Sequence, residues 1–174
     1  MSYTRFTRPA GGLEFVGSAR LAATSRDFTV SALAPKDFLI FYFHLFASDE
    51  GVAVRPEITF NDDASAIYDW GAGPSGGIDS LGANDTKIEL AGPSQLVTDA
   101  VFTGSYMTLN VANRRKDGYG TMGLSQSSVA GVDTYTSAGT WKNTTSRISK
   151  MRIRIQNAAG LWSFGRILVV GRDI

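Results

Sequence analysis

The sequence contains no cysteine and a single histidine, His44. Without cysteine, the chain forms neither disulfide cross-links nor thiolate metal sites. With one histidine, placed inside an apolar stretch, the usual nucleophile–base pairs of enzymes do not assemble convincingly. A histidine in such a place is more often a satisfied core or pore-facing residue than a general base. We therefore expect a protein that is not an enzyme and that holds no metal or cofactor.

Long apolar runs are also absent. The longest, Phe38 to Ala47, contains His44 and is far shorter than the ~20 residues that span a bilayer. No apolar segment follows Arg5 and Arg8 near the N-terminus, so the sequence predicts no secretory signal. We accordingly expect no membrane partner, and synthesis in a cytoplasm.

Neither sign of charge is in excess, since the formal net charge is +1. The charges are nevertheless segregated: ten acidic residues lie between Asp49 and Asp99, whereas six basic residues lie from Arg147 onward. A balanced charge without interleaved exposed aromatic residues argues against nucleic-acid binding. The segregation fits either two solvated sheet faces or complementary patches that meet between like subunits.

A period-two pattern near the C-terminus predicts a strand with one apolar and one basic face. The apolar residues are Met151, Ile153 and Ile155, and the cations are Lys150, Arg152 and Arg154. The continuous apolar run from Ile167 to Val170 is typical of a strand covered on both faces. The aromatic stretch from Asp37 to Ala47 predicts a strand at the centre of its sheet.

Short strands separated by Gly, Asn, Asp and Pro, without an amphipathic helix, predict an all-β, single-domain antiparallel β-sandwich over residues 13–174, with a barrel as the alternative. We expect Gly71 to Asp85 to form a loop without regular structure. We expect Asn113 to Gly118 to form a charged hairpin tip, with Asp117-Gly118 supplying its positive-φ turn. The predicted core consists of Phe41, Phe43, Leu45, Ile58, Phe60, Met151, Ile153, Ile155, Leu168 and Val170.

Residues 1–12 lack a clean period and end in Gly11-Gly12, which predicts an extended N-terminal arm. The alternative is a frayed terminus. Apolar, aromatic and basic side chains favour docking of the arm on a neighbouring protein, through Tyr3, Arg5, Phe6 and Arg8.

The order of several short motifs resembles a known group of proteins. The motifs are Leu13 to Ser18, the aromatic strand, Ile58 to Asp63 with Tyr68, Phe102 to Tyr106, Trp141, Arg147 to Ile153, and Phe164-Gly165 leading to Gly171. In this order they resemble small virion proteins of tailed bacteriophages. Those proteins have a jelly-roll β-sandwich and serve as head decoration (cement) proteins, head fibres or tail-fibre modules.

The resemblance implies a non-enzymatic structural protein of the virion. The implied partner is the phage major capsid protein or another virion protein, reached through the arm and through the basic strand with Lys150, Arg152 and Arg154. It also implies a homo-oligomer, with a trimer favoured. The protein would be made in the host cytoplasm and would then reside in the particle.

Three further kinds of site deserve comparison. A fibre module would bind a host glycan through aromatic platforms, for which Tyr68 and Trp70 are the leading candidates, with Trp70 expected to be the most exposed. The other aromatic candidates are Trp141, Trp162, Tyr119 and Tyr135. Asn61, Asp62, Asp63 and Asp69 offer oxygen ligands for Ca²⁺, but a solvated turn explains them better. Paired carboxylates for glycosidic cleavage are the weakest alternative.

Overall fold

The structure is a computed structural model that describes residues 12–48, 55–74, 80–91, 100–126, 129–157 and 159–174. Tyr3, Arg5, Phe6 and Arg8 of the expected arm lie outside the described residues. Docking through the arm therefore stays a prediction.

The described residues form twelve β-strands. The strands are β1 (Glu14–Arg20), β2 (Asp27–Val30), β3 (Phe38–Ser48), β4 (Pro56–Phe60), β5 (Tyr68–Pro74), β6 (Ser80–Asp85), β7 (Ile88–Glu89), β8 (Ala100–Leu109), β9 (Lys116–Gln126), β10 (Val129–Trp141), β11 (Met151–Ile155) and β12 (Leu161–Arg172).

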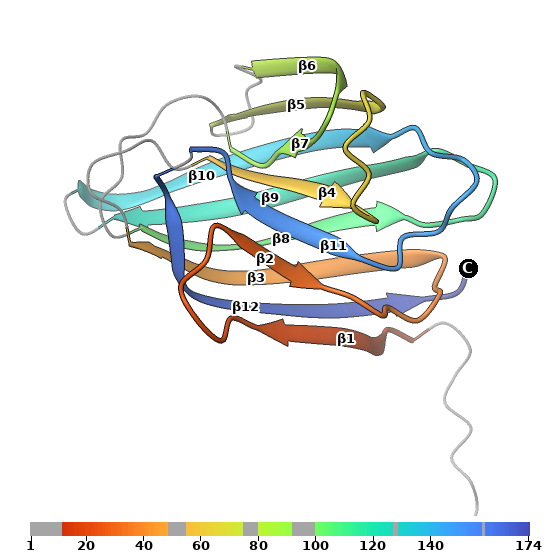
Figure 1. The fold of residues 1–174 in the computed structure, drawn as a ribbon, viewed down its shortest axis with the longest axis horizontal. Coiled ribbons are helices and arrows are strands. Elements are labelled where there is room, and N and C mark those ends of the chain that lie inside the picture. Colours follow the sequence, from red (N-terminus) through yellow and green to blue (C-terminus); the bar gives the residue numbers. More distant parts are fainter. Residues whose placement is uncertain (1–11, 49–54, 75–79, 92–99, 127–128, 158) are drawn as a thin grey trace, which may run out of the picture.

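The strands build two antiparallel sheets that pack face to face. The larger has eight strands in the order β1-β12-β3-β8-β9-β10-β5-β6, and the smaller has four in the order β2-β11-β4-β7. Figure 1 shows the smaller sheet lying over the larger one, which extends from β1 at one edge to β6 at the other. The predicted all-β sandwich is confirmed.

Pairing between strands is nested along the chain. β1 pairs with β12, β2 with β11, β3 with β8 and β4 with β7, as in a long hairpin that has been rolled up. The remaining four strands, β9, β10, β5 and β6, extend the larger sheet beyond β8. This extension makes one sheet twice as wide as the other.

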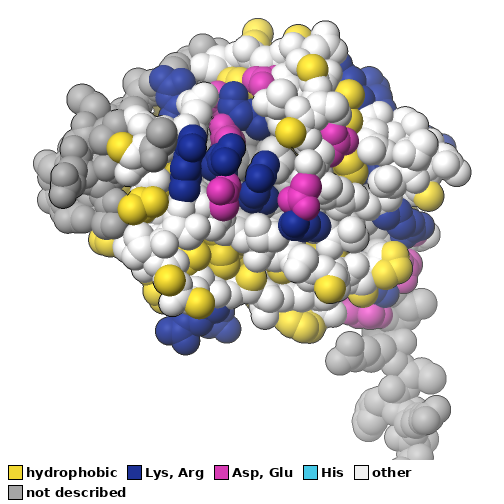
Figure 2. Space-filling model, in the orientation of Figure 1, with side chains coloured by type: hydrophobic (Ala, Val, Ile, Leu, Met, Phe, Trp, Pro, Cys, Tyr) yellow, Lys and Arg dark blue, Asp and Glu magenta, His cyan; other side chains and the backbone are white. Residues whose placement is uncertain are grey.

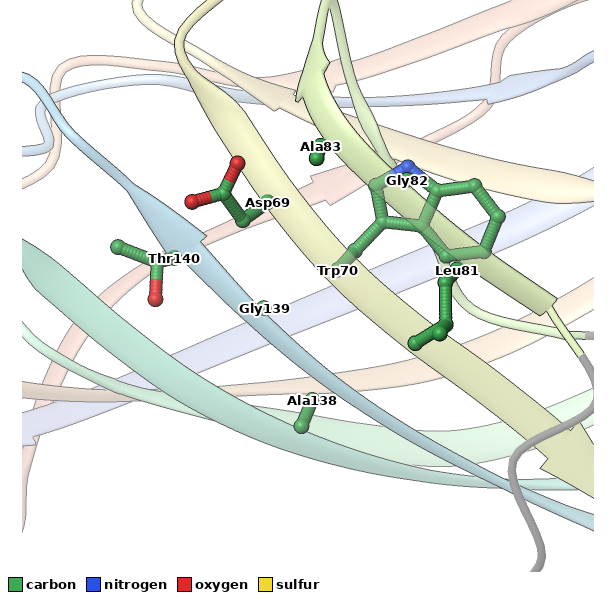
Figure 3. Close-up of a pocket in the computed structure, with 8 residues that line it drawn as sticks. All are labelled: Asp69, Trp70, Leu81, Gly82, Ala83, Ala138, Gly139 and Thr140. Carbon is green, nitrogen blue, oxygen red and sulfur yellow. The ribbon is translucent and has the colours of Figure 1, made fainter.

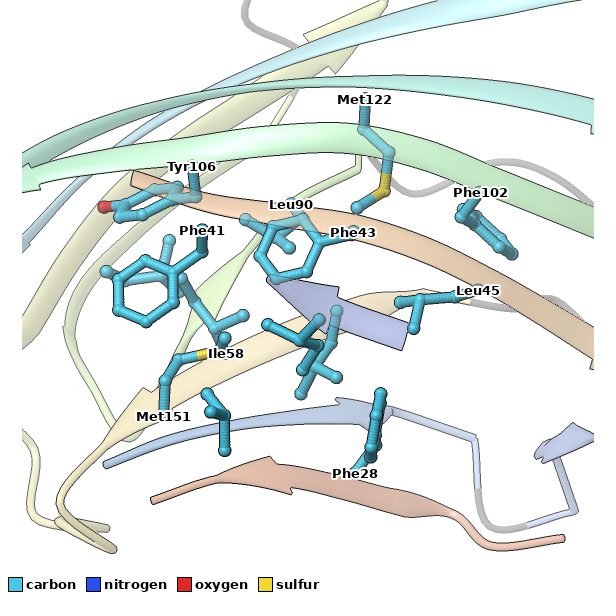
Figure 4. Close-up of a cluster of buried hydrophobic side chains, with 14 of the residues drawn as sticks. Phe28, Phe41, Phe43, Leu45, Ile58, Leu90, Phe102, Tyr106, Met122 and Met151 are labelled. Carbon is cyan, nitrogen blue, oxygen red and sulfur yellow. The ribbon is translucent and has the colours of Figure 1, made fainter. Parts of the chain in front are cut away.

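The core lies between the two sheets because alternate residues of each strand point inward. Figure 4 shows Phe41 and Phe43 of β3 pointing toward Met151 of β11 and Phe28 of β2. Phe60 lies at the centre of an aromatic cluster, with its ring centroid 6.2 Å from those of Phe41 and Tyr106 and 5.7 Å from that of Trp141. Each such side chain contributes about 1.5–3 kcal/mol through burial.

The predicted core is correct for eight of its ten residues but wrong for Leu168 and Val170. These two side chains lie on the outer face of the larger sheet, where Leu168 is 38% exposed. Ile167 and Val169 fill the core positions instead. A continuous apolar run does not show which parity faces inward, and in β12 both faces are apolar although only one is covered by the smaller sheet.

Two expected irregular segments are strands instead. Gly71 and Gly73 belong to β5 and pair with Ala138 and Thr136 of β10. Glycine interrupts the side-chain pattern without removing a backbone hydrogen bond, so the strand was not apparent from the sequence. The expected hairpin is present between β8 and β9, but Asp117-Gly118 does not form its turn, because both residues lie within β9. The turn before β9 instead has a positive φ of 60° at Asn113.

Candidate functional site

The larger sheet has an outer face that points away from the smaller sheet. On β3, the buried Leu39 and Phe41 alternate with Ile40 and Tyr42, which point outward. The same alternation places Met107 of β8 on the outer face. This outer face is the candidate functional site.

One row of side chains crosses the outer face over all eight strands. Consecutive register partners give, in order, Phe15, Val170, Ile40, Met107, Tyr119, Ala138, Gly71 and Leu81, which we call the apolar row. Leu81 is 78% exposed, Phe15 67%, Tyr119 45% and Met107 38%. Adjacent rows add further exposed apolar side chains, including Leu168, Tyr42 and Leu109. An extended apolar patch of this kind marks an interaction surface.

The described residues of the outer face line at least three shallow hollows. The largest, of about 480 Å³, lies over the β10, β5 and β6 end of the sheet. Figure 3 shows Trp70 and Leu81 on one side of it and Ala138 and Thr140 on the other. Gly139, between the last two, faces the core, where a Cβ would lie 2.8 Å from Ile88. The other two measure about 380 Å³ beside Phe164 and about 270 Å³ beside Tyr119.

The outer face carries arginines near one edge and carboxylates on β9 and β5. Asp117 of β9, in the middle of the sheet, is exposed and accepts a hydrogen bond from Thr140 Oγ1 at 2.7 Å. Arg166 and Arg172 lie on β12, near one edge, and the Arg172 guanidinium lies 5.8 Å from the ring centroid of Phe38. Asp69 lies on β5, near the other edge, 2.7 Å from the Lys142 ammonium. The hydrogen bond from Lys142 lowers the pKa of Asp69, so this carboxylate is ionised at neutral pH.

The outer face of the smaller sheet carries charge rather than apolar side chains. Figure 2 shows Lys and Arg side chains interspersed with Asp and Glu across it. Arg154 Nε lies 2.9 Å from Asp27 Oδ1 and Arg152 Nε lies 3.9 Å from the same atom, while Lys150 pairs with Asp62. These cations therefore have acidic partners within the chain. Complementary patches between like subunits are not needed to explain the segregation of charge. Partner binding through this strand stays a prediction.

The expectation that Trp70 is the most exposed aromatic residue is wrong. Its side chain is only 8% exposed, and the indole Nε1 donates a hydrogen bond to Asp85 Oδ2 at 2.9 Å. The Lys87 ammonium lies 5.9 Å from the ring centroid. Gly82 packs so closely that a Cβ there would lie 2.1 Å from Trp70 Nε1. The ring is thus held within the fold and does not offer an open platform.

Tyr68, the other expected glycan-binding residue, is fully buried. Its hydroxyl accepts a hydrogen bond from the Phe60 N–H at 3.0 Å and donates one to the Asp63 carbonyl at 3.1 Å. Burial raises the pKa of this hydroxyl. Tyr68 therefore holds the turn between β4 and β5, and among the six aromatic candidates Tyr119 is the exposed one.

The residues considered for catalysis or metal binding do not gather into one site among the described residues. His44 is exposed on the outer face rather than in the core, with Nδ1 3.2 Å from Thr103 Oγ1. Asp63 accepts a hydrogen bond from Trp141 Nε1 at 3.0 Å and serves the β4–β5 turn. Within the described residues, no three His, Asp or Glu side chains gather as metal ligands. The described part of the chain also contains no helix long and apolar enough to cross a bilayer.

Comparisons of the chain with protein-family models, with curated proteins and with solved structures find no match.

Proposed function

We propose that this protein is a non-enzymatic structural protein that acts by adhesion, burying the outer face of its larger sheet against another protein surface. The observation that carries the proposal is the apolar row, which leaves exposed side chains from β1 to β6. Within this class we propose a bacteriophage virion protein that decorates or cements the assembled head, in keeping with the resemblance of its motifs.

The nested strand order supports this more specific assignment. The orders β1-β12-β3-β8 and β2-β11-β4-β7 alternate early and late strands in both sheets. We infer a jelly roll from this arrangement, in which a rolled hairpin forms two packed sheets. The hairpin of β9 and β10, together with β5 and β6, widens one sheet and thereby enlarges the adhesive face.

Adhesion stabilises an assembly by mass action. A protein that binds only the assembled shell lowers the free energy of that shell by about 2.7 kcal/mol per site at a free concentration 100 times its dissociation constant. Apolar burial supplies the attraction at roughly 25 cal/mol per Å² of apolar surface. No bond is made or broken, and no catalytic group is needed.

The test uses phage heads purified without this protein. We expect the added protein to co-sediment with the heads and to raise the temperature at which they release DNA. Met107→Lys places a charge in the middle of the apolar row and should reduce binding. The matched control is Thr144→Lys, which adds the same charge to an exposed loop after β10. Heads that retain no wild-type protein would contradict the proposal.

The alternative function is a head- or tail-fibre module that binds a host glycan, and the hollow of about 480 Å³ beside Leu81 favours it. Because Leu81 is exposed, Leu81→Ala should leave the fold intact. Glycan-array binding by the wild type that is lost in Leu81→Ala would favour this alternative over adhesion.

A further inference from the structure

The apolar row is arranged symmetrically about the middle of the larger sheet. β8 and β9 are the fourth and fifth of its eight strands. Residues at equal distances from this midline form four pairs: Met107 with Tyr119, Ile40 with Ala138, Val170 with Gly71, and Phe15 with Leu81. In the second and third pairs a branched side chain is matched with alanine or glycine. Two of the four pairs are therefore complementary in size, whereas Met107 with Tyr119 and Phe15 with Leu81 bring large apolar side chains together.

Charge on the outer face is complementary in the same sense. Arg172 lies two residues beyond Val170 on β12, and Asp69 lies two residues before Gly71 on β5. Following the register partners of each strand places both on the same side of the apolar row. β12 is second from one edge of the sheet and β5 is second from the other. A reversed copy thus brings Arg172 of one subunit over Asp69 of the other, although this carboxylate already pairs with Lys142 of its own chain. It also brings Asp117 over Leu109.

We propose that the outer face binds a second copy of this chain, with a two-fold axis that runs parallel to the strands between β8 and β9. This inference rests on the adhesive role proposed above and names the partner of the same face. A two-fold axis perpendicular to the strands and passing through the apolar row would instead place each strand over itself, so that Arg172 would face Leu168 and Asp69 would face Gly73. Of the two axes, only the parallel one brings Arg172 over a carboxylate of the other subunit, and it is the one we propose.

The size and twist of the sheet are compatible with this dimer. Eight strands about 4.8 Å apart span about 34 Å, and the stretch from Phe38 to Phe46 rises about 26 Å, which gives about 900 Å² per copy. Two such faces, about 1,800 Å² together, exceed the roughly 1,600 Å² of a stable interface. A twisted sheet is saddle-shaped, and this rotation maps the saddle onto a parallel copy, so twist does not separate the faces.

The dimer also accounts for two strands that are apolar on both faces. β3 and β12 present large apolar side chains inward, and Ile40, Tyr42, Leu168 and Val170 outward. A strand of that composition is typical of a sheet covered on both sides. At the ends of the row, Phe15 of one subunit comes over the β5–β6 end of the other, where the hollow beside Leu81 lies.

The first experiment measures mass in solution by light scattering and sedimentation. We expect the wild type and Thr144→Lys at twice the 18.7 kDa of the chain. Met107→Lys should be a monomer with an unchanged circular dichroism spectrum, because two unpaired lysines in one interface weaken association about 100-fold or more. A wild-type monomer, or the trimer that the resemblance favours, would overturn the inference.

The second experiment tests the direction of the axis and exploits the absence of native cysteine. Ile40 and Ala138 lie three strands apart, about 14 Å, which is beyond the reach of a disulfide within one subunit. We expect the double variant Ile40→Cys/Ala138→Cys to give a covalent dimer with a thiol-reactive cross-linker about 10 Å long, which matches the spacing of two packed sheets and is shorter than the distance within one subunit. Each single variant should stay a monomer on denaturing gels. Efficient cross-linking by Ile40→Cys alone would indicate the perpendicular axis and refute the proposed one.

The two proposals fail in different ways. A monomeric wild type that binds heads and loses binding in Met107→Lys would leave adhesion in place and remove the dimer. A cross-linked dimer that binds no heads would support the dimer and remove the decoration role. The same variants therefore serve both measurements.

Discussion

Replacing Tyr68 by phenylalanine removes one hydroxyl and leaves the ring in place. The buried N–H of Phe60 then loses the acceptor that lies 3.0 Å away. The Phe60 carbonyl keeps the N–H of Asp63 at 2.9 Å, so its contact with the hydroxyl at 3.4 Å adds little. An orphaned buried donor costs about 1–3 kcal/mol, and we expect the free energy of unfolding to fall by about 2 kcal/mol.

The assay is urea unfolding followed by tryptophan fluorescence, with thermal unfolding alongside. A loss of about 2 kcal/mol corresponds to a fall of about 4–8 °C in the melting temperature of a chain this long. The control is Tyr119→Phe, the same chemical change at an exposed ring, for which we expect less than about 0.5 kcal/mol. All samples are compared at one protein concentration because association shifts apparent stability. Equal stabilities for Tyr68→Phe and wild type would refute the assigned hydrogen bonds.

Two further predictions concern the interior. Burial, and next the nearby charge of Arg147, lower the pKa of Lys116 in the folded chain below 10.5, so the unfolded chain binds this proton more tightly. The free energy of unfolding of wild type should therefore rise relative to Lys116→Met as pH approaches 10.5, and parallel pH profiles would contradict this. A Cβ at Gly104 would lie 2.1 Å from the Thr121 carbonyl oxygen, so Gly104→Ala should cost about 1–3 kcal/mol in urea unfolding. Gly12→Ala, which meets no atom within 4 Å, should cost far less.

Alternation identified the strands whose two faces differ in polarity. Met151, Ile153 and Ile155 are buried as the period-two pattern predicts, and the cations between them point outward. The pattern depends only on local chemistry, so it is visible without knowing which strands pair. Strand order is different, because it depends on contacts between distant segments such as β1 and β12.

The candidate site was not predicted because no local pattern describes it. The apolar row takes one residue from each of eight strands, and it exists only once their registers are known. The sequence did indicate that β3 and the end of β12 are apolar on both faces. That pattern predicts a covering layer, but it does not say whether the layer comes from the same chain.

The exposure of Trp70 and Lys116 could not be predicted from the sequence for a second reason. Tryptophan beside a glycine-rich segment was expected to be exposed, whereas Gly71 and Gly82 lie in paired strands and Gly82 packs on the indole ring. The Lys116 side chain is buried, with Nζ donating to the Asn143 carbonyl at 2.6 Å and lying 5.5 Å from the Trp141 ring centroid. Both placements result from tertiary packing that outweighs the usual preference of the residue type.

The nested pairing also bears on the order in which the chain is synthesised and folded. β12 lies between β1 and β3, and β11 lies between β2 and β4, so strands made late separate strands made far earlier. Until residues 151–172 emerge, β1 and β2 have none of their sheet partners, and each sheet lacks a strand from its interior. Before then, β2 lacks its one neighbouring strand, and β3 and β4 each lack one of two, so their apolar faces are incompletely covered during translation. Folding of the sandwich is therefore a late event, and nascent chains that stall before β11 are candidates for capture by chaperones.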